Sequence, residues 1–195
     1  MTTITLIGAG SAEFAAELVT DFLSVDALPE GDFRRVDIDP TRLELARGFA
    51  EHLLERAGKA WTVRADVDRT AVLAGSDVVI NTIEVAGLRN VRHDFDIPMR
   101  YGVDQCIGDT IGPGGLFKGL RTIPVFLDIL RDMRELCPQA IMLNYTNPMS
   151  MMICAAGRAV PEISVVGLCH SVQGTSHLLA RYAEFAGELL ERDRL

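Results

Sequence analysis

Short apolar runs alternate with amphipathic helical patterns along the chain, and this alternation constrains the fold more than any other feature. Six runs rich in β-branched residues predict strands: Thr3–Ile7, Phe33–Ile38, Trp61–Ala65, Asp77–Ile83, Ala140–Tyr145 and Ile163–Leu168. Strands separated by helices pair in parallel, because each connection has to cross back over the sheet. We therefore expect the α/β class: a doubly wound, Rossmann-like parallel sheet of six strands with helices on both faces.

A glycine turn follows the first predicted strand and leads into the first predicted helix. Its sequence is GAGSAEF at residues 8–14. In this context Gly8 permits the tight turn, Gly10 lets the backbone approach a pyrophosphate, and the helix N-terminus offers unpaired N–H groups to that anion. Glu13 stands where the usual third glycine would be, so we expect its carboxylate to point outward. We assign Gly8, Gly10 and Ser11 to a dinucleotide cofactor.

Two acids lie at and just beyond the end of the second predicted strand. Asp37 is placed to accept both ribose hydroxyls of the adenosine half, which favours NAD over NADP. Asp39 precedes Pro40 and fits an N-cap with proline at the first helical position. We assign Asp37 to the cofactor and Asp39 to the cap. Polar residues around the end of the fourth predicted strand are also assigned to the cofactor: Asn81, Thr82 and Glu84.

A glycine-rich segment, Gly102–Pro124, has Asp109 near its polar centre. A segment of this composition is either a flexible connector or a backbone cradle for a ligand. Helical spacing resumes from Leu120, which places Pro124 in the first turns of the next predicted helix.

The sixth predicted strand is followed directly by a thiol. Ile163–Leu168 is apolar and predicts a strand buried on both faces, and Cys169 and His170 follow it before a polar turn. Ligands of open parallel sheets bind beyond the carboxyl ends of the strands, so this thiol and imidazole are well placed for chemistry. The alternative is that Cys169 is a small buried hydrophobe and His170 a surface residue.

Composition limits the partners and the location. The 195 residues carry a net charge of −8 and no basic run, which disfavours nucleic acid and anionic membranes as partners. No apolar run of about 18 residues and no signal-peptide pattern occurs, so we expect no membrane anchor. Four cysteines without a CxxC pair indicate reduced thiols and a cytoplasmic protein.

Motifs spread along the chain resemble glycoside hydrolase family 4, with its α-galactosidase branch the most similar. They are GAGS from residue 8, DID from 37, INTIEVAG from 80, GDTIGPGG from 108, GLRTIP from 119, NYTNPM from 144 and GLCHSVQGT from 167. The resemblance implies a glycosidase that needs NAD and a divalent metal, usually Mn²⁺. In that mechanism NAD⁺ takes hydride from C3 of the sugar, a base removes the C2 proton, and the aglycone leaves by elimination. Water then adds and the ketone is reduced again.

The same resemblance implies roles for individual residues. Cys169 matches the thiolate ligand of the metal, and Asn147 matches an asparagine that contacts substrate hydroxyls near the metal. His170 matches a position that varies with substrate class, and we assign it to substrate binding and catalysis. Asp109 is assigned to catalysis, as a contact of the sugar or of the groups around it.

The similarity ends near Ser176, and the family's second metal ligand and catalytic base would lie beyond Leu195. We therefore expect an NAD-binding domain over residues 1–175 and a helix over 176–195 that starts a missing or truncated second part. The isolated chain should bind NAD without hydrolysing glycosides, and the full-length enzyme should be a homo-oligomer. The alternatives are an NAD-dependent dehydrogenase of the lactate/malate type and a truncated, non-catalytic NAD-binding module.

Overall fold

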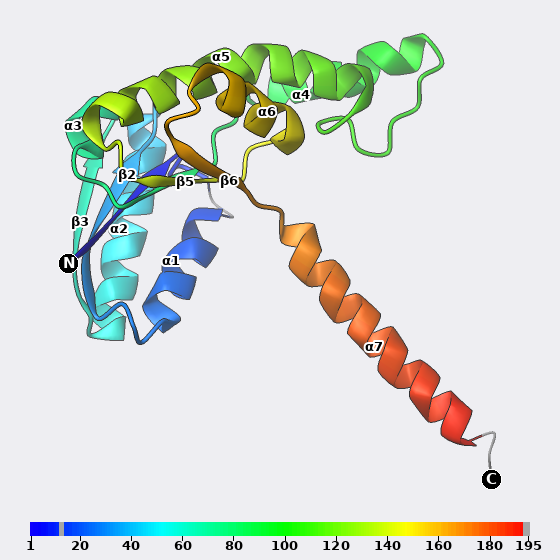
Figure 1. Cartoon of the computed structure of the whole chain (residues 1–195), viewed down its shortest axis with the longest axis horizontal. Helices are drawn as coiled ribbons and strands as arrows, with labels where there is room; N and C mark the ends of the chain where they lie inside the picture. The colour runs from blue at the N-terminus through cyan, green and yellow to red at the C-terminus, as the bar shows by residue number, and fades with distance from the viewer. Residues whose placement is uncertain (12–13, 193–195) are drawn as a thin grey trace.

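The computed structural model describes the backbone of residues 1–11 and 14–192, and side chains except at residues 14–16, 170, 173 and 185–192. The expectation for Glu13 therefore lies outside the described residues. Six strands form one parallel sheet in the order β3-β2-β1-β4-β5-β6 (Figure 1). They are β1 (Thr2–Ile7), β2 (Glu30–Val36), β3 (Ala60–Asp66), β4 (Val78–Asn81), β5 (Ile141–Asn144) and β6 (Ser164–Gly167). The order reverses between β1 and β4, and this topological switch point is where doubly wound sheets bind ligands.

Helices cover both faces of the sheet, which confirms the expected fold class. They are α1 (Phe14–Ser24), α2 (Pro40–Ala57), α3 (Thr70–Leu73), α4 (Gly87–Arg100), α5 (Gly112–Leu136), α6 (Met149–Ala159) and α7 (His170–Arg192). On one face α1 and α2 pack around Leu6 and Phe33 of the sheet. On the other face α3, α5 and α6 pack around Val79 and Met142. The apolar side chains of the strands are thus buried on two sides, as a parallel sheet requires.

The helix cap predicted at Asp39 is confirmed. The Asp39 side chain accepts hydrogen bonds from the backbone N–H groups of Thr41 and Arg42, and Pro40 occupies the first helical position. Gly58 ends the same helix with φ of 63°, a left-handed conformation that glycine adopts without strain. The Asp39 cap at the start of α2 fixes the direction in which the chain leaves Asp37.

The glycine-rich segment differs from its prediction, because α5 begins at Gly112 and Pro124 lies inside the helix. Each glycine in a helix interior is unfavourable by about 1 kcal/mol relative to alanine. Close packing overrides this penalty: a Cβ on Gly115 would lie 2.6 Å from the backbone of Thr110. A Cβ on Gly114 would likewise meet the backbone carbonyl of Gly108. The glycines therefore let the start of α5 press against the preceding loop.

The sixth strand also differs from its prediction of burial on both faces. β6 pairs with β5 and stands at the edge of the sheet, and Val166 is 40% exposed. An apolar run alone does not distinguish an edge strand from a central one. The polar turn expected after Cys169 is instead the beginning of α7, since a single glycine at position 174 does not prevent a helix.

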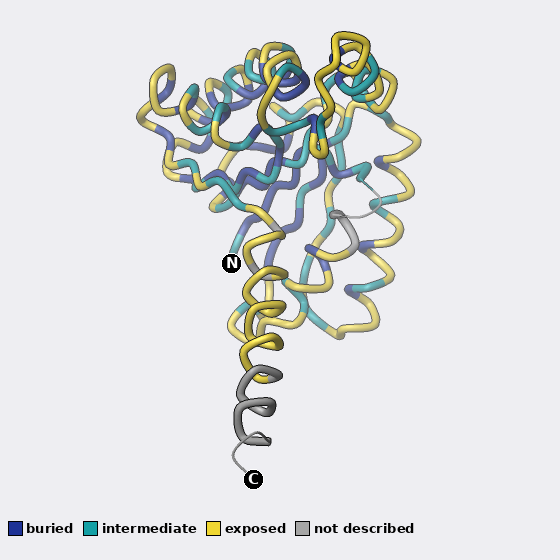
Figure 2. The backbone as a smooth tube through the Cα atoms, turned by 90° about the vertical axis from the view of Figure 1, so that its right-hand side faces the viewer, coloured by how far each residue is buried: buried dark blue, intermediate teal, exposed yellow. Residues whose placement is uncertain are grey.

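The last helix, α7, extends away from the sheet and its helices (Figure 1). Residues 174–184 along it are exposed, as the yellow segment of Figure 2 shows. Within the described part of the chain, no helix is long and apolar enough to cross a membrane. The division of the chain at residue 175 stays a prediction.

Candidate functional site

The glycine turn after β1 is closely packed against two neighbouring segments. Gly8 has φ of 88°, and a Cβ there would lie 2.8 Å from the backbone of Thr82. The N–H of Gly10 donates to Oδ2 of Asp37 at 2.7 Å, and a Cβ on Gly10 would lie 2.7 Å from the same oxygen. Glycine is therefore required at both positions for this geometry.

The Asp37 carboxylate is held at the end of β2 by two backbone donors. Oδ2 accepts from Gly10 and Oδ1 accepts from the N–H of Asp39 at 2.9 Å. Each carboxylate oxygen has two acceptor positions, so each retains capacity for a second donor. Binding of ribose hydroxyls by Asp37 stays a prediction.

Two residues assigned to the cofactor, Asn81 and Thr82, join strand ends in the structure. The Thr82 hydroxyl lies 3.1 Å from the carbonyl oxygen of Gly8. Asn81 is fully buried, and its Nδ2 donates to Oδ1 of Asn144 at 2.8 Å and to the hydroxyl of Thr146 at 3.1 Å. These bonds tie the carboxyl ends of β1, β4 and β5 together, and direct contact with a cofactor stays a prediction.

A buried lysine on α5 connects residues that the sequence had placed on separate segments. Lys118 is 5% exposed, and its Nζ lies 2.6 Å from Oε2 of Glu84 and 3.5 Å from Oδ2 of Asp109. Asp109 also accepts hydrogen bonds from Nδ2 of Asn147 at 3.1 Å and from the hydroxyl of Thr110 at 3.0 Å. The structure thus brings Glu84, Asp109 and Asn147 into one network.

Charge and hydrogen bonding keep Asp109 ionised. Burial pushes its pKa upward, but the hydrogen bonds from Asn147 and Thr110 and the charge of Lys118 outweigh burial and lower the pKa. At neutral pH Asp109 is therefore a carboxylate, which accepts hydrogen bonds or protons and donates none.

Sequence reasoning missed Lys118, although a signal for its burial exists. Lys118 precedes the fully buried residues Thr122 and Phe126 by four and eight positions, so it lies on the same face of α5. Leu120, from which the sequence predicts the helical spacing to resume, is 61% exposed. The helix face that carries Lys118 is the one that turns toward the sheet.

Cys169 follows the carboxyl end of β6, next to the strand that leads to Asn147. The backbone N–H of Leu168 donates to the carbonyl of Asn144 at 2.9 Å, which sets the two strand ends side by side. The Cys169 thiol is exposed and lies 2.8 Å from the hydroxyl of Ser171. That hydrogen bond is the main reason that the pKa of Cys169 is lowered, which favours the thiolate.

The interpretation of Cys169 as a buried hydrophobe is therefore wrong, since its side chain faces solvent. The side chain of His170 lies outside the described residues, and its role stays a prediction. Among the residues that the structure describes, no three His, Cys, Asp or Glu side chains form a cluster that could hold a metal ion.

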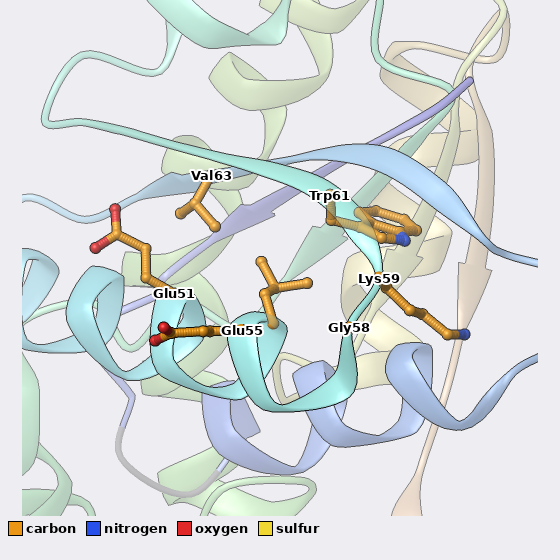
Figure 3. Close-up of a pocket in the computed structure, with 7 residues that line it drawn as sticks. Glu51, Glu55, Gly58, Lys59, Trp61 and Val63 are labelled. Carbon is orange, nitrogen blue, oxygen red and sulfur yellow. The ribbon is translucent and has the colours of Figure 1, made fainter.

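A hollow of about 280 Å³ lies elsewhere, between α2 and the amino-terminal half of β3 (Figure 3). Trp61, Val63, Glu51 and Glu55 are among its lining residues. Trp61 pairs in register with Gly31 at the start of β2, whereas Asp37 follows the other end of that strand. The hollow thus lies toward the amino-terminal ends of the strands, whereas the candidate site lies at their carboxyl ends.

The fold and the glycine turn define a member of the Rossmann class of α/β proteins. The chain belongs to the family 4 glycosyl hydrolases, whose family model matches residues 3–185. It is 45% identical over 174 residues to an α-galactosidase of Bacillus subtilis (strain 168) and 40% identical over 185 residues to an α-galactosidase of Rhizobium meliloti (strain 1021). These matches cover 89% and 94% of this chain but only 40% and 37% of the relatives, so the chain spans about two fifths of their length.

Solved structures give the same picture of the fold. The Bacillus subtilis protein lplD, named as a glucosidase, superposes with a TM-score of 0.85 at 32% identity, covering 93% of this chain and 41% of that one. The 6-phospho-β-glucosidase of Thermotoga maritima, solved with manganese, NAD⁺ and glucose-6-phosphate, superposes with a TM-score of 0.79 at 22% identity. That match covers 94% of this chain and 43% of the other, and it bears on the fold alone.

Proposed function

We propose that the protein is a glycosidase that hydrolyses α-galactosides with the help of NAD and a divalent metal, Mn²⁺ being the first candidate. One observation carries the proposal: a dinucleotide turn and an exposed thiol of lowered pKa follow strands of one parallel sheet in a family 4 chain. The resemblance to two α-galactosidases supports the choice of substrate. A dehydrogenase of the lactate/malate type is disfavoured by the family membership.

The cofactor would be held at the carboxyl ends of β1 and β2. Gly8 and Gly10 leave room for a pyrophosphate close to the backbone, and Asp37 has acceptor capacity for the ribose hydroxyls. Ser11, which follows the turn, would contact the phosphates. Asn81, Thr82 and Glu84 are proposed to line the path of the dinucleotide past β4. NAD⁺, when bound, supplies a hydride acceptor for the sugar and returns the hydride at the end of the cycle.

The metal would take Cys169 as a thiolate ligand. A ligating cysteine must lose its proton, and the hydrogen bond from Ser171 makes that loss easier. Sugar oxygens are among the ligands that suit Mn²⁺, so we assign further ligands to the substrate. The resemblance implies that the second protein ligand is a residue beyond Leu195. The metal would supply Lewis acidity toward the C3 oxygen of the sugar.

The sugar would be oriented by Asn147 and Asp109. Asn147 follows β5, and its amide is held by the hydrogen bond to Asp109. The ionised Asp109 is suited to accept a hydrogen bond from a sugar hydroxyl, or a proton from it. His170, directly after Cys169, is proposed to bind the sugar and to take part in catalysis. Oxidation at C3 makes the C2 proton acidic, and its removal expels the aglycone.

A nitrophenyl α-galactoside assay of the complete gene product, with NAD⁺, Mn²⁺ and a reductant, tests the proposal. We expect turnover that disappears with a chelator and in the Cys169→Ser variant, while NAD⁺ affinity stays nearly unchanged. Cys154→Ser is the matched control, since Cys154 is also an exposed free thiol. Turnover that persists in chelator would refute a metal role for Cys169.

Isotope exchange separates this chemistry from its alternatives. Reaction in D₂O should place deuterium at C2 of the released sugar, because that proton is removed and replaced. A dehydrogenase would instead accumulate one NADH per substrate oxidised, and a binding module would give neither product. We further propose a cytoplasmic homo-oligomer that binds neither nucleic acid nor membranes, to be checked by fractionation, light scattering and binding assays.

A further inference from the structure

A fully buried arginine lies directly beneath the glycine turn. Arg35 on β2 is 0% exposed, and its Nη2 donates to the carbonyl oxygen of Ala9 at 3.1 Å. Its Nη1 donates to the carbonyl oxygen of Ala46 in α2 at 2.5 Å, and its guanidinium lies 5.3 Å from the centre of the Phe33 ring. Among the described residues, no carboxylate forms an ion pair with Arg35, and its Nε has no hydrogen-bond partner.

Arg35 remains charged in spite of its burial. Burial disfavours the cation and lowers the pKa of Arg35 to about 10, which is still well above neutral pH. A buried cation without a carboxylate partner is unfavourable for folding, and an apolar side chain of similar size would fill the same space. The position of this charge therefore calls for an explanation in terms of what it contacts.

The contact with Ala9 places Arg35 in a chain of hydrogen bonds that ends at Asp37. The Ala9 carbonyl and the Gly10 N–H belong to the same peptide unit. Arg35 donates to the carbonyl oxygen of Ala9. The N–H of Gly10, at the other side of the same peptide, donates to Oδ2 of Asp37 at 2.7 Å. A cation on the carbonyl side polarises the peptide and strengthens the bond that its N–H makes.

We propose that Arg35 is a positioning residue that acts through the Ala9–Gly10 peptide to hold the Asp37 carboxylate in the geometry that binds the ribose of an adenine nucleotide. The proposal rests on the proposed cofactor site and adds to it a residue that never touches the ligand. The ligand class is adenine nucleotides whose adenosine ribose carries free hydroxyls. Arg35 thereby affects recognition of those hydroxyls more than the rest of the nucleotide.

Calorimetry with ADP and 2′-deoxy-ADP separates this role from a simple structural tie between the turn and α2. In the wild-type protein, losing the 2′-hydroxyl should weaken binding by about tenfold, as expected for a hydrogen bond to a carboxylate. In Arg35→Met this ratio should fall to about threefold or less, as it should in Asp37→Asn. Arg64→Met is the control, because Arg64 is an exposed cation on β3, and its ratio should stay at the wild-type value.

Four outcomes would overturn the proposal. Arg35→Met could weaken ADP and 2′-deoxy-ADP by the same factor, which would leave Arg35 a structural tie only, or it could change neither affinity. If Arg35→Met does not fold, as judged by circular dichroism, the neutral Arg35→Gln decides by the same ratio, and an unchanged ratio refutes the role. If the wild-type protein binds neither ADP nor NAD⁺, the cofactor site itself is wrong, which is distinguishable from a failure of Arg35 alone.

Discussion

Replacing Lys118 by methionine should destabilise the protein and should do so in a pH-dependent way. Methionine fills a similar volume but removes the ammonium group between Glu84 and Asp109. Breaking a buried ion pair by removing one partner is worth about 3–5 kcal/mol. The Glu84 and Asp109 side chains are 34% and 29% exposed, so water can replace part of the lost interaction. We therefore expect a loss of about 1–3 kcal/mol in the free energy of unfolding near neutral pH.

The pH dependence follows from the lowered pKa of Asp109. A carboxyl group whose folded pKa lies below its ordinary value of 3.8 stabilises the fold above that value, and this stabilisation is lost as the pH falls through the folded pKa. Lys118 acts on Asp109 only while Asp109 is charged. The difference between wild type and Lys118→Met should therefore shrink below about pH 4.

Urea unfolding followed by circular dichroism, at several values between neutral and acidic pH, measures this difference. Arg92→Met is the matched control: it also removes one positive charge, but the Arg92 side chain is 81% exposed in its pair with Asp96. The control should change the free energy of unfolding by less than about 0.5 kcal/mol. An effect of Lys118→Met that equals the control, or that stays constant down to acidic pH, would contradict the described network.

Other substitutions test the remaining parts of the site. Iodoacetamide should label the exposed Cys169 and spare the buried Cys137, because burial raises the pKa of Cys137 to about 11. Ser171→Ala should slow the labelling of Cys169 several-fold, since it removes the hydrogen bond to the thiol. Mass spectrometry measures the labelling rate, and an unchanged rate in Ser171→Ala would contradict this role of Ser171. Gly8→Ala introduces a Cβ 2.8 Å from the neighbouring backbone at φ of 88°, so we expect at least tenfold weaker NAD⁺ binding in calorimetry. Asp39→Ala removes a helix cap and should lower the free energy of unfolding by about 1 kcal/mol; no change in urea midpoint would speak against the cap.

The sheet and the glycine turn were predictable because their signals are local. Strand runs, the turn from Gly8 to Gly10 and the cap at Asp39 each depend on residues close together in the sequence. Such patterns also predict that the polar residues following the strands lie close together, because the carboxyl ends of parallel strands meet at one end of the sheet. The predicted strands consequently differ from the observed ones mainly at their ends.

The partners of the buried cations were not predictable from the same patterns. Lys118 is held by Glu84, which lies 34 positions away, and Arg35 is held by Ala9, which lies 26 positions away. A charged residue next to glycines or in a strand gives no local sign of such partners, and burial of charge is rare enough that exposure is the default expectation. The early start of α5 was missed for a related reason, because glycine disfavours helix locally but permits close packing that only the fold shows.

The helix α7 joins Cys169 directly to a segment that extends away from the sheet (Figure 1). Its 23 residues span about 35 Å, and the helix begins at the residue after the thiol, with no linker between. Because the helix begins directly after Cys169, a contact that fixes the orientation of α7 also limits the directions in which the chain can leave Cys169.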